Sequence, residues 1–153
     1  MNPVFKKMNY KEQKVIHALN SPASFDNDLK EMAGVAKIRK QLKTTDNAEF
    51  IICFCTKLKE VEAAAVLAQI TLKDDGMIWL AYPKGTSKNY KCEFNRDIGW
   101  DSLGKAGFEP VRQVAIDDDW SALRFRRVEF IKTMKRSFAM TEEGKKRVAA
   151  KKK

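Results

Sequence analysis

A strand, a helix and a second strand follow one another between residues 50 and 82, and this succession restricts the fold more than any other part of the chain. Residues 50–55, FIICFC, are apolar throughout, which is typical of a strand covered on both faces. Residues 58–70 carry apolar side chains at helical spacing among strong helix formers, and after a polar KDDG turn residues 77–82, MIWLAY, are apolar again. Two strands joined by such a helical crossover lie parallel, so the unit predicts an α/β domain.

The flanking segments extend this sheet at both ends. Residues 14–19, KVIHAL, predict a strand that ends at the turn-forming NSP, and Ser24 is placed to cap a short helix after it. Residues 36–42 carry lysine and arginine, as expected of an exposed edge strand.

The C-terminal part predicts a helix that ends at glycines and then two strands, at residues 111–116 and 121–130. Alternation places Leu123 and Phe125 on one face of the last strand and Arg124 and Arg126 on the other. Only three residues separate Ile116 from Trp120, a link that is too short for a crossover. The last strand should therefore be antiparallel to the one before it.

The basic charge of the chain is concentrated at its C-terminal end. The 153 residues carry a formal net charge of +10, and residues 132–153 hold nine Lys or Arg against two Glu, a net charge of +7. We therefore expect one α/β domain over residues 1–131 and a basic tail, flexible or short-helical, over residues 132–153. The tail is either a solvated end or an arm that binds nucleic acid without sequence specificity. The candidate polyanion-binding residues are Lys145, Lys146, Arg147, Lys151, Lys152 and Lys153.

The apolar segments and the cysteines bear on the cellular location of the protein and on metal binding. No apolar run approaches the roughly 18 residues that span a bilayer, and no secretory signal pattern opens the chain, so we expect a cytoplasmic protein with no membrane partner. Cys53 and Cys55 stand two apart in an apolar run, which points to small buried thiols on one face. A zinc site is the alternative, but His17 is the only histidine and no C-x-x-C spacing occurs.

Two resemblances follow from these segments. The run of parallel units closed by an antiparallel strand resembles the C-terminal half of class I S-adenosylmethionine methyltransferases. The resemblance implies a Rossmann-like, mostly parallel sheet flanked by helices and closed by a C-terminal antiparallel hairpin strand. The segments WLAYPK, with Trp79, Pro83 and Lys84, and VAID and WSALRF, at residues 114–117 and 120–125, are more specifically similar to a bacterial family catalogued as a domain of unknown function.

The chain departs from the methyltransferase pattern at the first strand. The cofactor-binding turn of those enzymes is rich in glycine, whereas LNSPASF contains none. An acidic residue to hold ribose hydroxyls is also absent after the second strand, unless Asp46 serves. The sequence therefore predicts that S-adenosylmethionine binds weakly or not at all. We expect no cofactor, with S-adenosylmethionine as the alternative.

Ligands of open α/β sheets bind outside the carboxyl ends of the parallel strands, where three loops of this chain should meet. Polar residues around Gly85 suit either a phosphate or carboxylate cradle or a solvated turn. Asp117, Asp118 and Asp119 suit either a divalent cation or, as we favour, a tight turn in which Asp117 pairs with Arg124 or Arg126. The candidates for this ligand edge are Ser21, Lys84, Thr86, Ser87, Arg96, Asp97, Asp117 and Trp120.

No pattern in the chain assigns a catalytic residue or a metal ligand, and His17 lies inside a strand rather than in a loop. The sequence favours a module that binds a small ligand or a protein partner without catalysis. Two alternatives stay open. One is a divergent S-adenosylmethionine-dependent methyltransferase, and the other is a nucleic-acid-associated protein that binds through its tail.

Overall fold

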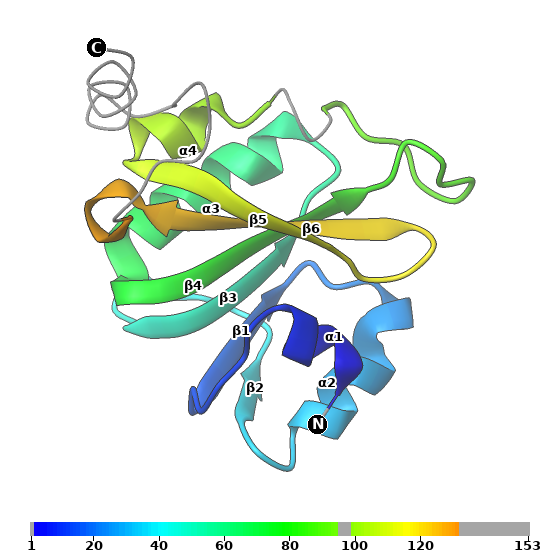
Figure 1. The fold of residues 1–153 in the computed structure, drawn as a ribbon, viewed down its shortest axis with the longest axis horizontal. Helices are drawn as coiled ribbons and strands as arrows, with labels where there is room; N and C mark the ends of the chain where they lie inside the picture. Colours follow the sequence, from blue (N-terminus) through cyan, green and yellow to red (C-terminus); the bar gives the residue numbers. More distant parts are fainter. Residues whose placement is uncertain (1, 95–98, 132–153) are drawn as a thin grey trace.

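A computed structural model describes residues 2–94 and 99–131, which form a six-stranded sheet with helices on both faces (Figure 1). The helices are α1 (Pro3–Lys7), α2 (Asp26–Met32), α3 (Leu58–Thr71) and α4 (Asp101–Lys105), with 3-10 helices η1 (Ala23–Phe25) and η2 (Val128–Phe130). The strands are β1 (Val15–Leu19), β2 (Lys37–Arg39), β3 (Ala48–Phe54), β4 (Leu72–Pro83), β5 (Phe108–Ala115) and β6 (Trp120–Arg127).

The strand order is β2-β1-β3-β4-β6-β5. Strands β2, β1, β3 and β4 are parallel, and β6 runs antiparallel to both of its neighbours, β4 and β5. The predicted fold class is thus confirmed, including the edge position of β2, the central position of β3 and the antiparallel hairpin at the C-terminal end. Because β5 runs in the same direction as β4, the β5–β6 turn lies at the carboxyl edge of the parallel strands.

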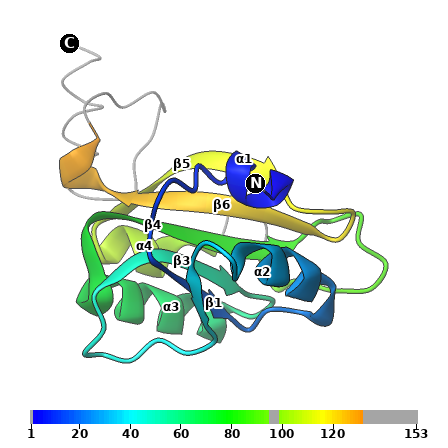
Figure 2. The same ribbon diagram turned by 90° about the horizontal axis from the view of Figure 1, so that it is seen from below.

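The sheet separates two apolar cores. One contains Phe25 and Leu29 from the η1–α2 segment, Phe5 from α1 and Trp79 from β4, while the other contains Val61 and further residues of α3 and α4. Figure 2 shows α3 and α4 next to each other and away from α1. The alternation of β6 follows the prediction, because Leu123 and Phe125 belong to the α3–α4 core and Arg124 and Arg126 point to the opposite face.

Helix α1 has no counterpart among the predicted elements. The Asn2 side chain caps it by accepting hydrogen bonds from the backbone N–H groups of Val4 and Phe5 at 3.0 and 3.1 Å. Pro3 occupies the first helical position, where its missing N–H costs nothing. The amide of Asn2 donates to Asp28 and Glu31 of α2, which ties the two helices together.

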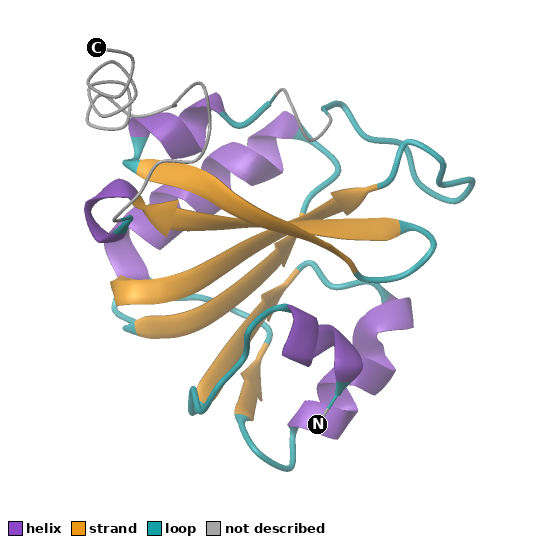
Figure 3. Cartoon of the chain, in the orientation of Figure 1, coloured by secondary structure: helices purple, strands orange, loops and turns teal. Residues whose placement is uncertain are grey.

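The KDDG segment is not a separate turn, and this prediction is wrong. Strand β4 begins at Leu72, directly after α3 ends at Thr71, and runs without interruption to Pro83 (Figure 3). The polar residues form an irregularity inside the strand, where Asp74 takes φ 43° and the register to β3 shifts. Aspartate tolerates this left-handed conformation better than most residues, and for that reason a turn-like sequence fits within a strand.

None of the described helices is long and apolar enough to cross a membrane. The predicted tail, residues 132–153, lies outside the described residues, as do Arg96 and Asp97 of the predicted ligand edge.

Candidate functional site

The connections that leave β1 and β3 lead toward opposite edges of the sheet. From β1 the chain passes through α2 to β2 at one edge, and from β3 it passes through α3 to β4 toward the other edge. Because α2 and α3 cover opposite faces of the sheet, the loops that leave β1 and β3 part from each other. Such a point of divergence at the carboxyl ends of parallel strands is where α/β proteins bind ligands.

A crevice of about 550 Å³ lies at this divergence, a volume within the range of small-molecule sites. We call it the switch-point crevice. Its walls come from the end of β1, the segment after β2, the end of β3 and the first turns of α3. The lining residues are Leu19, Asn20, Lys40, Gln41, Leu42, Lys43, Cys53, Lys59, Glu60, Ala63, Ala64 and Leu67.

Two charged side chains of the crevice, Lys40 and Glu60, already bond to other groups of the protein. Lys40 lies 3.5 Å from an Asp26 carboxylate oxygen of α2 and donates to the Ser21 hydroxyl at 3.1 Å, so the segment after β2 contacts α2 and the loop after β1. The Oε1 atom of Glu60 caps α3 by accepting from the backbone N–H groups of Thr56 and Lys57. The Oε2 atom of Glu60 has no hydrogen bond within the described part of the protein, which leaves an acceptor at the crevice.

The turn after β1 obtains its shape from Asn20. This residue has φ 56°, a left-handed conformation that glycine adopts readily and asparagine more often than most other residues. The chain therefore takes a left-handed turn directly after β1, although LNSPASF contains no glycine. The sequence analysis took the missing glycine as evidence against backbone approach to the cofactor, and the left-handed Asn20 shows that the turn forms without glycine.

Replacement of Asn20 by glycine and by valine should show whether its contribution to stability comes from the backbone conformation or from side-chain contacts. Asn20 is exposed, and its one described hydrogen bond is a long contact of 3.8 Å to the Cys53 sulfur. We expect Asn20→Gly to keep wild-type stability within about 0.5 kcal/mol. Asn20→Val should lower the free energy of unfolding by about 1–2 kcal/mol, because a β-branched residue resists positive φ. Urea denaturation measures both, and equal stabilities would contradict a role for the bend.

A second hollow, of about 800 Å³, lies at the carboxyl end of β4. Lys84, Thr86 and Ser87 of the predicted ligand edge line it, together with Tyr90, Lys91 and other residues of the same loop, and Gln113 and Ser121 of the β5–β6 hairpin. Gln113 donates a hydrogen bond to the Tyr82 hydroxyl at 2.9 Å across this hollow. The two hollows therefore open at the same edge of the sheet, one at β1 and β3 and the other at β4.

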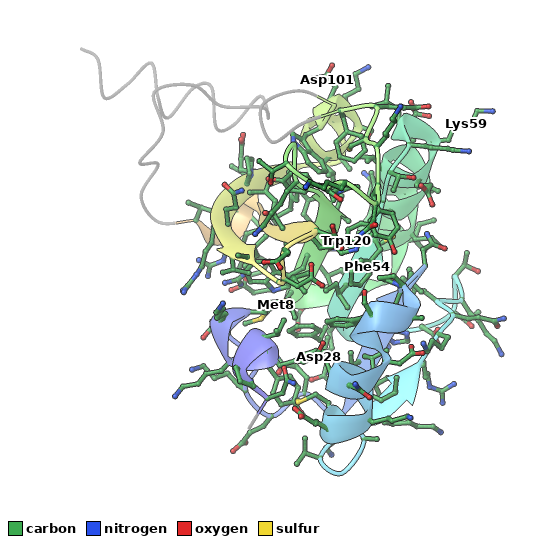
Figure 4. The ribbon with its side chains drawn as sticks, turned by 90° about the vertical axis from the view of Figure 1, so that its right-hand side faces the viewer. Met8, Asp28, Phe54, Lys59, Asp101 and Trp120 are labelled. Atoms are coloured by element: carbon green, nitrogen blue, oxygen red, sulfur yellow. The ribbon has the colours of Figure 1, made fainter. Side chains whose placement is uncertain are left out.

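Aromatic rings connect the loops at this edge. Phe25 from the segment after β1 lies 5.0 Å from Phe54 of β3, Phe54 lies 5.0 Å from Trp120, and Trp120 lies 4.8 Å from Tyr90, measured between ring centroids. Figure 4 shows Phe54 and Trp120 beside each other. Three loops far apart in the sequence thus meet, as predicted, although they meet through buried rings and not through polar side chains alone.

The β5–β6 turn is held by its aspartates, but differently from the prediction. Asp117 accepts hydrogen bonds from the backbone N–H groups of Asp119 and Trp120, both at 2.8 Å. Arg126 instead pairs with Asp75, so the predicted pairing of Asp117 across the hairpin is wrong. The carboxylate stays local because its short side chain reaches the next backbone N–H groups more easily than a distant guanidinium.

Asp119 links the hairpin to the loop after β4. Its backbone carbonyl accepts from Lys84 N–H at 2.7 Å, and its carboxylate accepts from the Ser87 hydroxyl at 2.8 Å and from the Asn89 amide at 3.1 Å. Of the eight predicted edge residues, the structure brings Lys84, Thr86, Ser87, Asp117 and Trp120 to one side of this edge. Ser21 lies at the β1 side with Lys40.

The cysteines occupy the positions predicted for buried thiols. The sulfur atoms of Cys53 and Cys55 are 3.7 Å apart on the α3 side of the sheet. The hydrogen bond with Cys53 and burial raise the pKa of Cys55, which keeps this thiol protonated at neutral pH. In residues 2–94 and 99–131, no three His, Cys, Asp or Glu side chains are grouped so as to hold a metal ion.

No protein-family model and no curated protein matches the chain. Solved structures do match in fold. A SAM dependent methyltransferase from Aquifex aeolicus superposes with a TM-score of 0.52 and 13% identity over 82% of this chain and 88% of that one. The N-methyltransferase NodS from Bradyrhizobium japonicum gives 0.52 and 10% over 81% and 92% of the two chains. The pyocyanin biosynthetic protein PhzM gives 0.51 and 12% over 83% and 54%.

These matches confirm the methyltransferase-like fold and correct two predictions from the sequence. A module without catalysis and without a cofactor was the favoured interpretation, yet two of these similar structures are methyltransferases by name. The comparison therefore supports the alternative over the favoured interpretation. The favoured interpretation depended on the absence of glycine from LNSPASF, yet Asn20 in this segment takes a left-handed conformation without glycine.

Proposed function

We propose that the protein is an S-adenosylmethionine-dependent methyltransferase that binds its cofactor in the switch-point crevice. The crevice position carries this proposal: it lies between the ends of β1 and β3, at the divergence point of a methyltransferase-like sheet. Its volume of about 550 Å³ is sufficient for a nucleoside with an amino-acid substituent.

The polar groups of the crevice suit the parts of such a cofactor. Glu60 Oε2 and the Gln41 amide are acceptors for ribose hydroxyls, in place of the acidic residue that β2 lacks. Asp46 does not fill that role, because it is not among the residues that line the crevice, and its carboxylate accepts from the Lys43 backbone N–H at 2.8 Å. The amino groups of Lys43 and Lys59 suit the carboxylate of the amino-acid part. When bound, the cofactor supplies an activated methyl group, and this chain positions it.

The hollow at the end of β4 is the place we propose for the methyl acceptor. Lys84 and Lys91 line it, and neither has an acidic partner among the residues described. This charge favours an acceptor that carries a carboxylate or phosphate group. Two of the three segments that resemble the bacterial family of unknown function reach this hollow, WLAYPK through Pro83 and Lys84 and WSALRF through Ser121. We therefore also propose that the chain is related to that bacterial family.

Filling the crevice tests the proposal directly. Ala63 is an exposed residue of α3 that lines the crevice, whereas Val66 is an exposed residue of the same helix that does not. We expect the wild-type chain and Val66→Trp to bind S-adenosylmethionine or S-adenosylhomocysteine with a dissociation constant at or below about 10 μM, near −7 kcal/mol. Ala63→Trp should bind at least about tenfold more weakly, since the indole occupies ligand space.

Isothermal titration calorimetry measures these constants, and circular dichroism verifies that both tryptophan variants fold. Absence of binding to the wild-type chain at millimolar ligand would refute the proposal. Equal binding by both variants would place the ligand outside the crevice.

We also propose a cytoplasmic location. The described residues include three free cysteines, two of them buried, and thiols persist in reducing compartments.

A further inference from the structure

Three arginines lie on one face of the C-terminal half of the sheet. Arg112 of β5 and Arg124 of β6 are register partners, and Arg126 follows Arg124 by two positions on the same face. We call these three residues the arginine face. Like charges directly opposite each other on adjacent strands repel, so this arrangement costs stability unless an anion lies between them.

Only one of the three charges is neutralised by a described carboxylate. The Arg126 guanidinium makes two hydrogen bonds to Asp75, at 2.8 and 2.6 Å, which raise the pKa of Arg126. The Nε atom of Arg124 is buried and has no hydrogen-bond partner in the described chain. Burial, with the positive charge of Arg126 and Arg112, lowers the pKa of Arg124.

An indole N–H adds to the unmatched donors. Trp79 of β4 is the register partner of Arg124 on the other side of β6, and it is fully buried. Its Nε1 atom also has no hydrogen-bond partner within residues 2–94 and 99–131. Trp79 is enclosed in the core and is out of reach of an external anion. Buried donors without acceptors are rare in folded proteins, so the partly accessible Arg124 calls for an acceptor that the described chain does not supply.

The surroundings of the arginine face favour an extended anion. Arg112 is exposed, and Arg124 and Arg126 are half-buried. After β6 and η2 the sequence continues into residues 132–153, with a net charge of +7.

We propose that the arginine face binds the phosphodiester backbone of nucleic acid, with Arg112 and Arg124 each contacting a phosphate. Guanidinium groups bind phosphate oxygens through paired hydrogen bonds, so the anion would relieve the repulsion between the two arginines. This surface lies on the sheet face and not at the carboxyl edge, so the inference does not depend on the proposed methyltransferase activity.

Fluorescence anisotropy with a labelled duplex DNA, at several salt concentrations and with the full chain, tests the proposal. The variant Arg112→Gln/Arg124→Gln removes two charges from the arginine face, and Lys30→Gln/Lys105→Gln removes two exposed charges from α2 and α4. Both keep residues 132–153 unchanged. We expect the arginine variant to bind about tenfold more weakly than the lysine variant at low salt. Its slope of log K against log salt should be flatter by about 1.8, the value for two phosphates.

Arg112→Gln alone, at an exposed position, covers the case in which the double variant fails to fold, and it should flatten the slope by about 0.9. Equal affinities and slopes for the arginine and lysine variants would overturn the proposal, as would absence of binding by the wild-type chain at low salt. Tighter binding to poly-glutamate than to DNA would also overturn it, because the face would then suit an acidic polypeptide.

Discussion

Replacement of Trp120 by alanine should lower the free energy of unfolding by about 4 kcal/mol. The side chain is 3% exposed and contacts the rings of Phe54 and Tyr90, so its removal leaves a cavity where three loops meet. A loss of this size is a large part of the total stability of an ordinary domain. Urea denaturation followed by circular dichroism measures it. Because Phe54 and Tyr90 would lose their common neighbour, binding at the carboxyl edge should weaken as well.

Trp120→Phe is the matched control. The ring N–H of Trp120 is buried without a hydrogen-bond partner in the described residues, so the tryptophan already pays a desolvation cost. Phenylalanine keeps an aromatic ring in place and removes the unpaired donor. We expect it to cost less than half of the alanine loss. If both variants were as stable as the wild-type chain, the aromatic connection would have no structural importance.

Gly99→Ala is expected to destabilise the protein by about 3 kcal/mol. Gly99 has φ 103°, a conformation that side chains rarely adopt, and an added Cβ would lie 2.4 Å from the Phe94 Cβ atom and 3.2 Å from Leu58 Cδ2. Both effects oppose the substitution, since the backbone would be strained and Phe94 would have to move. Phe94 also lines the hollow at the end of β4, so the binding that we propose there should weaken together with stability.

Gly85→Ala is the control for this prediction. An added Cβ at Gly85 meets no atom within 4 Å, and Gly85 does not take positive φ. The substitution should change the unfolding free energy by less than about 1 kcal/mol, with a small gain from the less flexible unfolded chain. Thermal denaturation of both variants measures the contrast. A Gly99→Ala protein as stable as Gly85→Ala would show that the Phe94 loop adapts freely.

The fold was predictable where periodicity and connection length act together. The apolar run at residues 50–55 gave the position of β3, and the short link between Ile116 and Trp120 required the antiparallel hairpin. The apolar run and the short link are both local features of the sequence, so they can be read without knowing the tertiary structure. Helix α1 was missed because it has only five residues, too few for a periodic pattern, although Asn2 followed by Pro3 is a helix-start signal.

The candidate site was less predictable, because it depends on backbone angles and on the register between strands. The left-handed conformation of Asn20 has no sequence signature as clear as glycine. The opposition of Arg112 and Arg124 follows from a register shift between Pro110 and Arg112, which a hairpin link of known length does not specify. Asp117 was correctly assigned to the turn, but its partners were not, since local backbone donors were available.

The division of the interior into two cores has a practical consequence for engineering. Side chains that belong to separate clusters, such as Phe25 on one face and Phe108 on the other, share no partner in either cluster. Free-energy changes at distant sites without shared contacts are additive to within about 0.5 kcal/mol. Stabilising substitutions selected separately for each face should therefore have additive effects on the free energy of unfolding. Substitutions in the α3–α4 core should stabilise the protein without changing the arginine face.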